Sequence, residues 1–274
     1  MTKLLLTSAA AACLANACAA ADLTPPPKTD AKGWIVTVSV IGAVRPSFPG
    51  SSQMRPYPFP AVSFRRVGEP ETFSTPDEGF GLDVLDVGYV KAGPVANFVF
   101  ERGRRPELFG LHTVGLTHEI GGFVEAYPLD HFRVRAEMRQ GIDGHKGFVA
   151  AFYADAYETL GAFRLSVGPR LNFGDNTYAN SFFSVTPFEA LLNGRLTPYQ
   201  ATGGFTAAGG MATARYDIND LTSVSVYGGG QRLLGSVGSS PIPNIVGSRN
   251  QFNAGLAVSR SFVVNPAAFL PNLF

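Results

Sequence analysis

The stretch HFRVRAEMRQ, residues 131–140, alternates polar and apolar side chains. Its odd positions carry a histidine and the charged residues: His131, Arg133, Arg135, Glu137 and Arg139. Its even positions are apolar as far as Met138. A period of two places successive side chains on opposite faces of a strand, whereas a helix would scatter the same residues around its circumference. The stretch therefore predicts a β-strand with one charged face and one apolar face.

Comparable alternation recurs along the chain, for example in residues 148–158, 162–173 and 252–262. Such segments are separated by turn-forming Gly, Pro, Asn and Asp. The expected strands are 34–44, 60–67, 88–100, 112–127, 131–140, 148–158, 162–173, 205–217, 221–231 and 252–262. The irregular stretch 71–87 is expected to add a short pair, which makes twelve strands; ten is the alternative. Either even number leaves both ends of the wall on the same side of a membrane.

Two architectures fit a chain of such strands. A soluble sandwich would bury the apolar faces, whereas a transmembrane barrel turns them to lipid and the charged faces to its lumen. The expected strands reach about ten residues, the length that spans a membrane, while soluble strands average about five or six. Short turns also alternate with long loops at 101–111, 174–204 and 232–250. We therefore predict an all-β fold: an antiparallel transmembrane β-barrel of twelve strands with long extracellular loops.

The first residues predict export. Lys3 is followed by an apolar run from Leu4 to Ala15 and by small residues before Asp22, the order found in a secretory signal peptide. Both cysteines, Cys13 and Cys18, lie within this segment, so no disulfide framework is expected in the exported chain. The expected location is the cell outer membrane, with its lipid as a partner.

The predicted organisation follows from this signal. It consists of a signal peptide (1–21), a Pro-rich periplasmic linker (22–33), an outer-membrane β-barrel (34–262) and a C-terminal tail (263–274). The formal net charge of the chain is +1, which gives no reason to expect a polyanionic partner. Nucleic acid is therefore not an expected ligand.

Charged strand faces predict a lumen lined by ion pairs, because lipid would not tolerate the arginines. The candidate lumen charge cluster consists of Arg133, Arg135, Glu137, Arg139, Asp155, Arg164, Arg170, Glu119 and Glu125. Asp155 is expected to lie near both Arg133 and Arg164. Since the arginines of this set outnumber its carboxylates, the lumen is expected to be mildly positive. Two roles stay open: the side chains fill a narrow barrel, or they bind or conduct a small solute with a preference for anions.

Catalytic chemistry finds little support in the sequence. A hydrolase needs a nucleophile, a base and an orienting group within hydrogen-bond reach, and no GxSxG motif occurs. His118 falls on the expected lipid face, and His145 lies in a hairpin turn. Adjacent strand residues such as His118 and Glu119 point to opposite faces, so they do not form a metal site. We expect no enzyme activity, no cofactor and no metal.

Several motifs carry a resemblance to a known family. GPRLNFGDNTYANSFFSVT (168–186), AEMRQGIDGHKGF (136–148), QRLLGSVGSSPI (231–242) and PSFPGSS (46–52) resemble the MipA/OmpV family of Gram-negative outer-membrane proteins. The resemblance extends from about Trp34 to Phe262. The chain departs from the family pattern at Ser236, where an acidic residue is usual, and in the tail after Phe262.

The resemblance implies a barrel with a structural or scaffolding role and without established catalysis. It implies association with a murein transglycosylase, MltA, and a penicillin-binding synthase, or a part in envelope adaptation; His145 would stabilise its hairpin turn. A narrow anion-preferring channel or solute-binding barrel is the alternative, and an outer-membrane hydrolase is the least favoured of the three.

Overall fold

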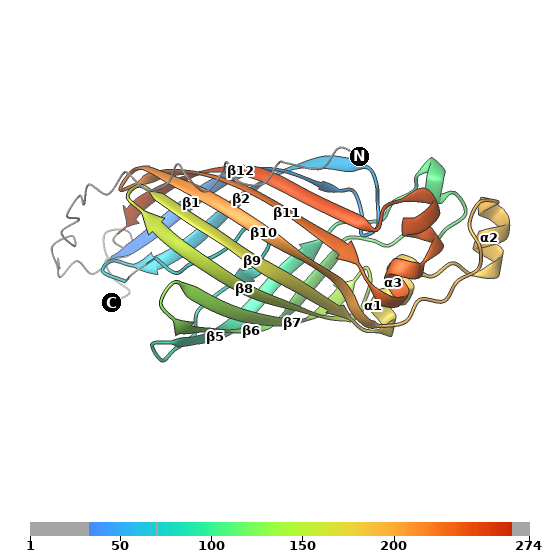
Figure 1. The fold of residues 1–274 in the computed structure, drawn as a ribbon, viewed down its shortest axis with the longest axis horizontal. Coiled ribbons are helices and arrows are strands. Elements are labelled where there is room, and N and C mark those ends of the chain that lie inside the picture. Colours follow the sequence, from blue (N-terminus) through green and yellow to red (C-terminus); the bar gives the residue numbers. More distant parts are fainter. Residues whose placement is uncertain (1–32, 70, 265–274) are drawn as a thin grey trace, which may run out of the picture. The chain divides into compact units, whose positions relative to one another are not determined.

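A computed structural model describes residues 33–69 and 71–264 of this chain. The predicted signal peptide (1–21), almost all of the linker (22–33) and the tail beyond residue 264 lie outside the described residues. The described part is dominated by strands, with short helices gathered at one end (Figure 1).

Twelve strands form a single antiparallel sheet that curls into a barrel, as the sequence predicts (Figure 1). The strands are β1 (Trp34–Pro46), β2 (Met54–Arg66), β3 (Phe80–Gly81), β4 (Leu85–Asp86), β5 (Val90–Val99), β6 (Thr117–Leu129), β7 (Phe132–Asp143), β8 (Phe148–Leu160), β9 (Phe163–Gly174), β10 (Gly204–Asn219), β11 (Thr222–Leu233) and β12 (Asn250–Val264). The order around the wall is β2-β1-β12-β11-β10-β9-β8-β7-β6-β5-β3, and β4 also pairs with β5. Sequential neighbours therefore pair as an up-and-down meander, and β1 meets β12.

The burial of the strands is inverted with respect to a soluble protein. In β7, Arg133 and Glu137 are each 0% exposed, whereas Met138 is 53% exposed. The same alternation of buried polar and exposed apolar side chains runs through β6 and β8. An apolar outer surface around a polar interior is the arrangement of a transmembrane barrel and excludes the soluble sandwich.

The two ends of the barrel differ in their connections. Short turns join β6 to β7, β8 to β9 and β10 to β11, and His131 and Gly161 adopt positive φ within the first two. Trp34 pairs with Val264 at this same end, which we call the short-turn rim. Both ends of the wall therefore lie on one side, as expected for an even number of strands; in outer-membrane barrels the short turns face the periplasm.

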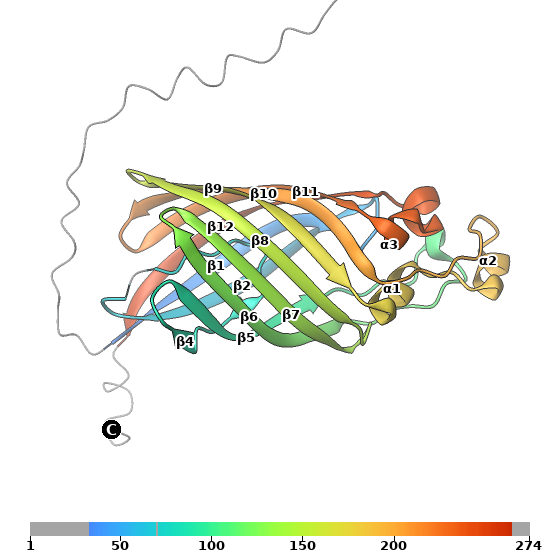
Figure 2. The ribbon, with the colours of Figure 1, turned by 60° about the horizontal axis from the view of Figure 1, so that its bottom comes forward.

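The opposite end, the long-loop rim, carries the helices (Figure 2). These are a 3-10 helix η1 (Pro106–Leu108), α1 (Asn176–Phe183), α2 (Pro187–Asn193), α3 (Gly235–Ser239) and a π-helix η2 (Ile242–Val246). Phe182 and Phe183 of α1 pack with Val237 of α3 and with Leu233 at the end of β11. A second apolar cluster joins Phe48, Leu108, Val185, Ala190, Leu196 and Ile242. No helix in the described ranges is long and apolar enough to cross a membrane.

Most strand boundaries lie within three residues of those expected, and two strand starts differ by five residues or more. β2 begins at Met54 rather than at residue 60, because its prolines continue the strand instead of ending it. β6 begins at Thr117 rather than at 112. The stretch 71–87 contributes the expected short pair, β3 and β4, which lie in series along one side of β5.

Candidate functional site

The charged face of β7 forms the centre of a buried ion-pair network. Arg133, Arg135, Glu137 and Arg139 lie at every second position of the strand, and all are less than 9% exposed. Glu125 of β6 accepts from Arg135 at 2.9 Å, and Glu119 accepts from Arg139 at 2.8 Å. Each arginine meets a carboxylate on a neighbouring strand, and Glu137 pairs with Arg135 and Arg139 of its own strand; this pairing offsets the large desolvation penalty of burying the charges.

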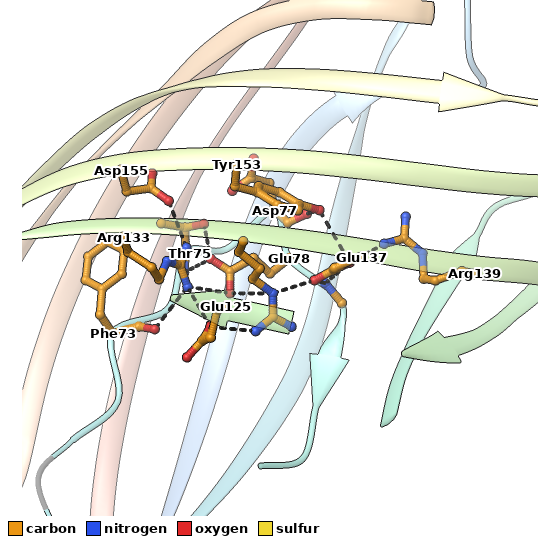
Figure 3. A network of polar contacts seen from close by, with 12 residues as sticks. Phe73, Thr75, Asp77, Glu78, Glu125, Arg133, Glu137, Arg139, Tyr153 and Asp155 are labelled. Atoms are coloured by element: carbon orange, nitrogen blue, oxygen red, sulfur yellow. Dashed lines mark hydrogen bonds and ion pairs between the residues drawn. The ribbon is translucent and has the colours of Figure 1, made fainter. Parts of the chain in front are cut away.

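A segment inside the barrel supplies further partners. Residues 71–79 precede β3 and cross to the wall formed by β7, β8 and β9 (Figure 3). Arg133 donates to the Phe73 carbonyl at 3.1 Å and forms a close ion pair with Glu78. Arg170 of β9 donates to Asp77 at 2.6 Å and to the Thr75 hydroxyl at 3.2 Å. We call residues 71–79 the inner segment; the wall arginines hold it within the lumen.

Glu137 joins the inner segment to the wall. Its carboxylate accepts from Arg135 at 2.9 Å, is paired with Arg139, and accepts from the backbone N–H of Gly79 at 3.2 Å. The Tyr153 hydroxyl lies 3.4 Å from the same carboxylate (Figure 3). Losing any of these donors would leave part of the buried carboxylate without a hydrogen-bond partner.

The expected proximity of Arg133 to Asp155 is confirmed, with the two side chains 2.8 Å apart. The expected pair between Asp155 and Arg164 is wrong, because Asp155 takes Arg170 as its second partner at 2.9 Å. Arg164 lies near the short-turn rim, where it pairs with Glu71 at 2.6 Å and with Asp217 at 3.1 Å. The register explains the change: Arg164 lies opposite Thr159, close to the turn, whereas Arg170 lies opposite Tyr153.

The expected positive lumen is also wrong. The inner segment adds Glu71, Asp77 and Glu78, which the alternation of the strands did not reveal. The ion-paired arginines of the described lumen are Arg133, Arg135, Arg139, Arg164, Arg170 and Arg215. Their carboxylate partners are Glu71, Asp77, Glu78, Glu119, Glu125, Glu137, Asp155 and Asp217. The arginines are therefore neutralised. The only sequence signal for these partners was an acidic, non-alternating stretch between two strands.

His145 closes the network toward the long-loop rim. It is 1% exposed, and its Nε2 lies 2.9 Å from Glu119. The backbone N–H of Gly147 donates to its Nδ1 at 3.1 Å, so the ring also fixes the hairpin between β7 and β8. The ring of Tyr178 on α1 meets the imidazole edge-on, with centroids 5.1 Å apart. Helix α1 therefore contacts the end of the ion-pair network that lies nearer the long-loop rim.

A cleft of about 710 Å³ lies among the long loops, lined by residues of α1 and α2 together with His112 and Tyr199. Glu189 accepts from His112 Nδ1 at 2.7 Å and from the backbone N–H of Thr186 at 2.8 Å. Burial opposes ionisation of Glu189, but backbone hydrogen bonds from His112 and Thr186 lower its pKa to about 2. The other ring nitrogen of His112 lies 3.0 Å from the Ser181 carbonyl.

This pair of His112 and Glu189 does not form a catalytic triad. A hydrolase would place a hydroxyl at the free imidazole nitrogen, and here that nitrogen faces a carbonyl. Glu189 instead completes the N-terminal capping box of α2 with Thr186. Within the described residues, no cluster of three or more His, Cys, Asp or Glu could hold a metal ion.

A family model described as MltA-interacting protein MipA matches residues 38–262. The chain belongs to the MipA family. The matched residues run from within β1 to within β12, so the family model covers the barrel wall. With its apolar outer surface, this MipA-family barrel is an outer-membrane protein.

Solved structures similar to this MipA-family chain are also outer-membrane proteins. The N-terminal β-barrel domain of Pseudomonas aeruginosa OprF is 10% identical, with 83% of this chain and 97% of that chain covered, at a TM-score of 0.29. An outer membrane channel from Pseudomonas putida F1 is 9% identical, with 87% and 100% covered, at a TM-score of 0.41. Similarity at this level indicates no function. No curated protein sequence matches the chain significantly.

Proposed function

We propose that this MipA-family barrel is a non-conducting and non-catalytic scaffold in the outer membrane. The observation that carries the proposal is the inner segment, which the arginines of β7 and β9 hold across the lumen. Apolar packing of α1 and α3 at the long-loop rim adds a second barrier. A barrel this narrow is near the size that side chains and loops can block, whereas open aqueous pores are typical of about 16 strands.

The proposed partner is a murein transglycosylase, because the family is described by its interaction with MltA. Murein lies on the periplasmic side, so the docking surface should be the short-turn rim. Leu129 and Leu160, the last residues of β6 and β8, are both exposed at this rim. A penicillin-binding synthase, which the sequence resemblance implies as a further partner, would join through the same complex.

Affinity capture of the tagged protein from cross-linked envelopes tests the scaffold. We expect a murein transglycosylase in the eluate, and we expect Leu129→Ser combined with Leu160→Ser to reduce its recovery. The matched control is Leu191→Ser, which changes an exposed leucine of α2 at the opposite rim. Loss of recovery in the control with normal recovery in the rim variant would contradict docking at the short-turn rim. Absence of any murein enzyme would contradict the scaffold itself.

Conductance in planar bilayers separates the scaffold from the alternative channel. The purified barrel should show no steady current, since the inner segment crosses the lumen and α1 and α3 pack at the long-loop rim. A steady anion-selective current from the intact protein would favour the channel. Because neutralised arginines attract anions only weakly, the anion preference expected from the sequence loses its physical basis.

A further inference from the structure

The sheet of this barrel has two free edges. Its order begins at β2 and ends at β3 beside β5, and no pairing joins β2 to β3, β4 or β5 among residues 33–69 and 71–264. We call this gap between β2 and the β3–β5 edge the seam. In the hydrocarbon of a membrane, unpaired N–H and C=O groups are costly, which is why membrane barrels normally close completely. The edge of β2 therefore needs a physical explanation.

The backbone hydrogen bonds between β1 and β2 show which backbone groups of β2 face the seam. The Val67 N–H donates to the Gly33 carbonyl at 3.0 Å, and the Ser47 N–H donates to the Gln53 carbonyl at 2.9 Å. These two bonds bracket the continuous β1–β2 ladder, in which Val40 lies opposite Pro60. Antiparallel ladders alternate hydrogen-bonded and non-hydrogen-bonded pairs. Odd-numbered residues of β2 therefore bond to β1, and even-numbered residues direct their backbone groups at the seam.

Three of these even positions are proline: Pro56, Pro58 and Pro60. Proline has no N–H, so at these three positions the β2 edge presents no donor to the seam, while pairing with β1 at the intervening residues is kept. At the other end of the strand, the Arg66 N–H is satisfied by the Glu69 carboxylate at 3.0 Å. An edge that lacks donors at three successive seam-facing positions cannot form a regular ladder with a neighbouring strand there, and it leaves fewer orphaned groups in lipid than the same edge with those donors.

Side chains bridge the outer end of the seam where the ladder does not. Tyr57 of β2 packs against Phe100, just beyond β5, with ring centroids 4.5 Å apart. The guanidinium of Arg45 lies 4.3 Å from the Tyr57 ring centroid and 4.5 Å from that of Phe100. These contacts hold the two edges together near the long-loop rim. The described residues form no comparable bridge nearer the short-turn rim.

The flanks of the seam at membrane depth are apolar. Val62 and Phe64 are exposed on β2, and Phe80 and Leu82 are exposed on the opposite edge. Because the rows on both sides face lipid, acyl chains are the molecules that adjoin the gap. We propose that the prolines prevent a ladder from closing the wall from its outer end, and that the unbridged part of the seam, between the Tyr57–Phe100 contact and the short-turn rim, takes an acyl chain of an outer-membrane lipid. This inference goes beyond the scaffold role and does not depend on the transglycosylase.

A matched pair of inward-facing positions tests the opening. Ser39 of β1 lies between Ala61 of β2 and Ser259 of β12 in one row of the sheet. The Ser39 and Ser259 hydroxyls are 2.7 Å apart, so the row shares one face. Ala61 borders the seam, whereas Ser259 lies two strands away at the same depth. Val258, whose side chain is exposed on the outer face, serves as the reference for lipid contact.

Each of these three positions is changed to cysteine in the full-length protein, spin-labelled and reconstituted in phosphatidylcholine vesicles that contain acyl-chain nitroxide lipid. We expect the Ala61→Cys label to be broadened by the lipid probe as the Val258→Cys label is, and the Ser259→Cys label to be unaffected. Equal, water-like behaviour of the Ala61 and Ser259 labels would overturn the proposal. Disulfide-linked dimers of Ala61→Cys in place of lipid contact would also overturn it, since a second copy would then occupy the seam.

The prolines are tested by replacing Pro56, Pro58 and Pro60 together with threonine in the Ala61→Cys background. Restored donors should let the edge pair, so the label should lose contact with the lipid probe or the protein should dimerise. Heat-modifiability on gels establishes that the variant is folded. A folded variant with unchanged lipid contact and no dimer would refute the assignment of the open seam to the prolines.

Discussion

Glu137 is 0% exposed and shows how single residues hold this barrel together. Glu137→Gln removes the charge that faces Arg135 and Arg139, so we expect a loss of about 3 kcal/mol in the free energy of unfolding, the order found when one partner of a buried pair is removed. The control is Arg164→Gln, whose side chain is 41% exposed at the rim and should cost less than about 1 kcal/mol because water screens it. The unfolding temperature on heat-modifiability gels compares the two. Equal shifts would contradict a tightly buried network.

Glu189 gives a prediction for pH at the long-loop rim. Its pKa is lowered from an ordinary value of 4.5 to about 2, so its charged form stabilises the folded loop above pH 4.5. That contribution is lost as the pH falls from 4.5 through about 2. A carboxyl carbon NMR titration should therefore give a midpoint near pH 2 for this residue, with Glu189→Gln used to assign the signal. A midpoint near 4.5 would mean that the bonds from His112 and Thr186 do not persist in solution.

At the scale of elements, the inner segment is the part whose release should change behaviour most. Asp77→Asn combined with Glu78→Gln removes the charges that pair with Arg170 and Arg133. The segment should loosen and uncover wall arginines, so we expect an anion-preferring current in planar bilayers. Asp86→Asn is the control, since this exposed carboxylate forms an ion pair with Lys91, at 3.5 Å, and makes no ion pair with the wall arginines among the described residues. If the double variant conducted no more current than the intact barrel, the inner segment would not be the barrier.

Elements also differ in how far the sequence predicted them. β7 was predicted within a few residues, because lipid on one face and a polar lumen on the other impose strict alternation. The predicted start of β2 was too late, because proline usually marks a turn. Among strands, only an edge strand accepts proline repeatedly. The inner segment could not be predicted: Glu78 meets Arg133 across 55 positions of the chain, and Asp77 meets Arg170 across 93. A segment that neither faces lipid nor pairs with a strand in the sheet carries no periodic signal.

At the scale of the whole molecule, export remains a prediction of the sequence. The outer-membrane form should begin at Asp22, or one or two residues earlier, because small residues occupy the positions that a signal peptidase requires there. N-terminal sequencing of protein purified from outer membranes checks this. An intact Met1 or a lipid-modified Cys18 would contradict it.

The sequence by itself determined the architecture of this protein: all-β, antiparallel, twelve strands, charged face inward, with long loops at one rim. It could do so because the membrane acts on every strand alike, and one rule of alternation is repeated along the chain. Only the tertiary structure decided which carboxylate meets which arginine, that the lumen is neutralised, and that the wall stays unpaired beside β2. Those outcomes depend on contacts between residues far apart in the chain, whose distances arise only when the sheet curls and the inner segment enters it.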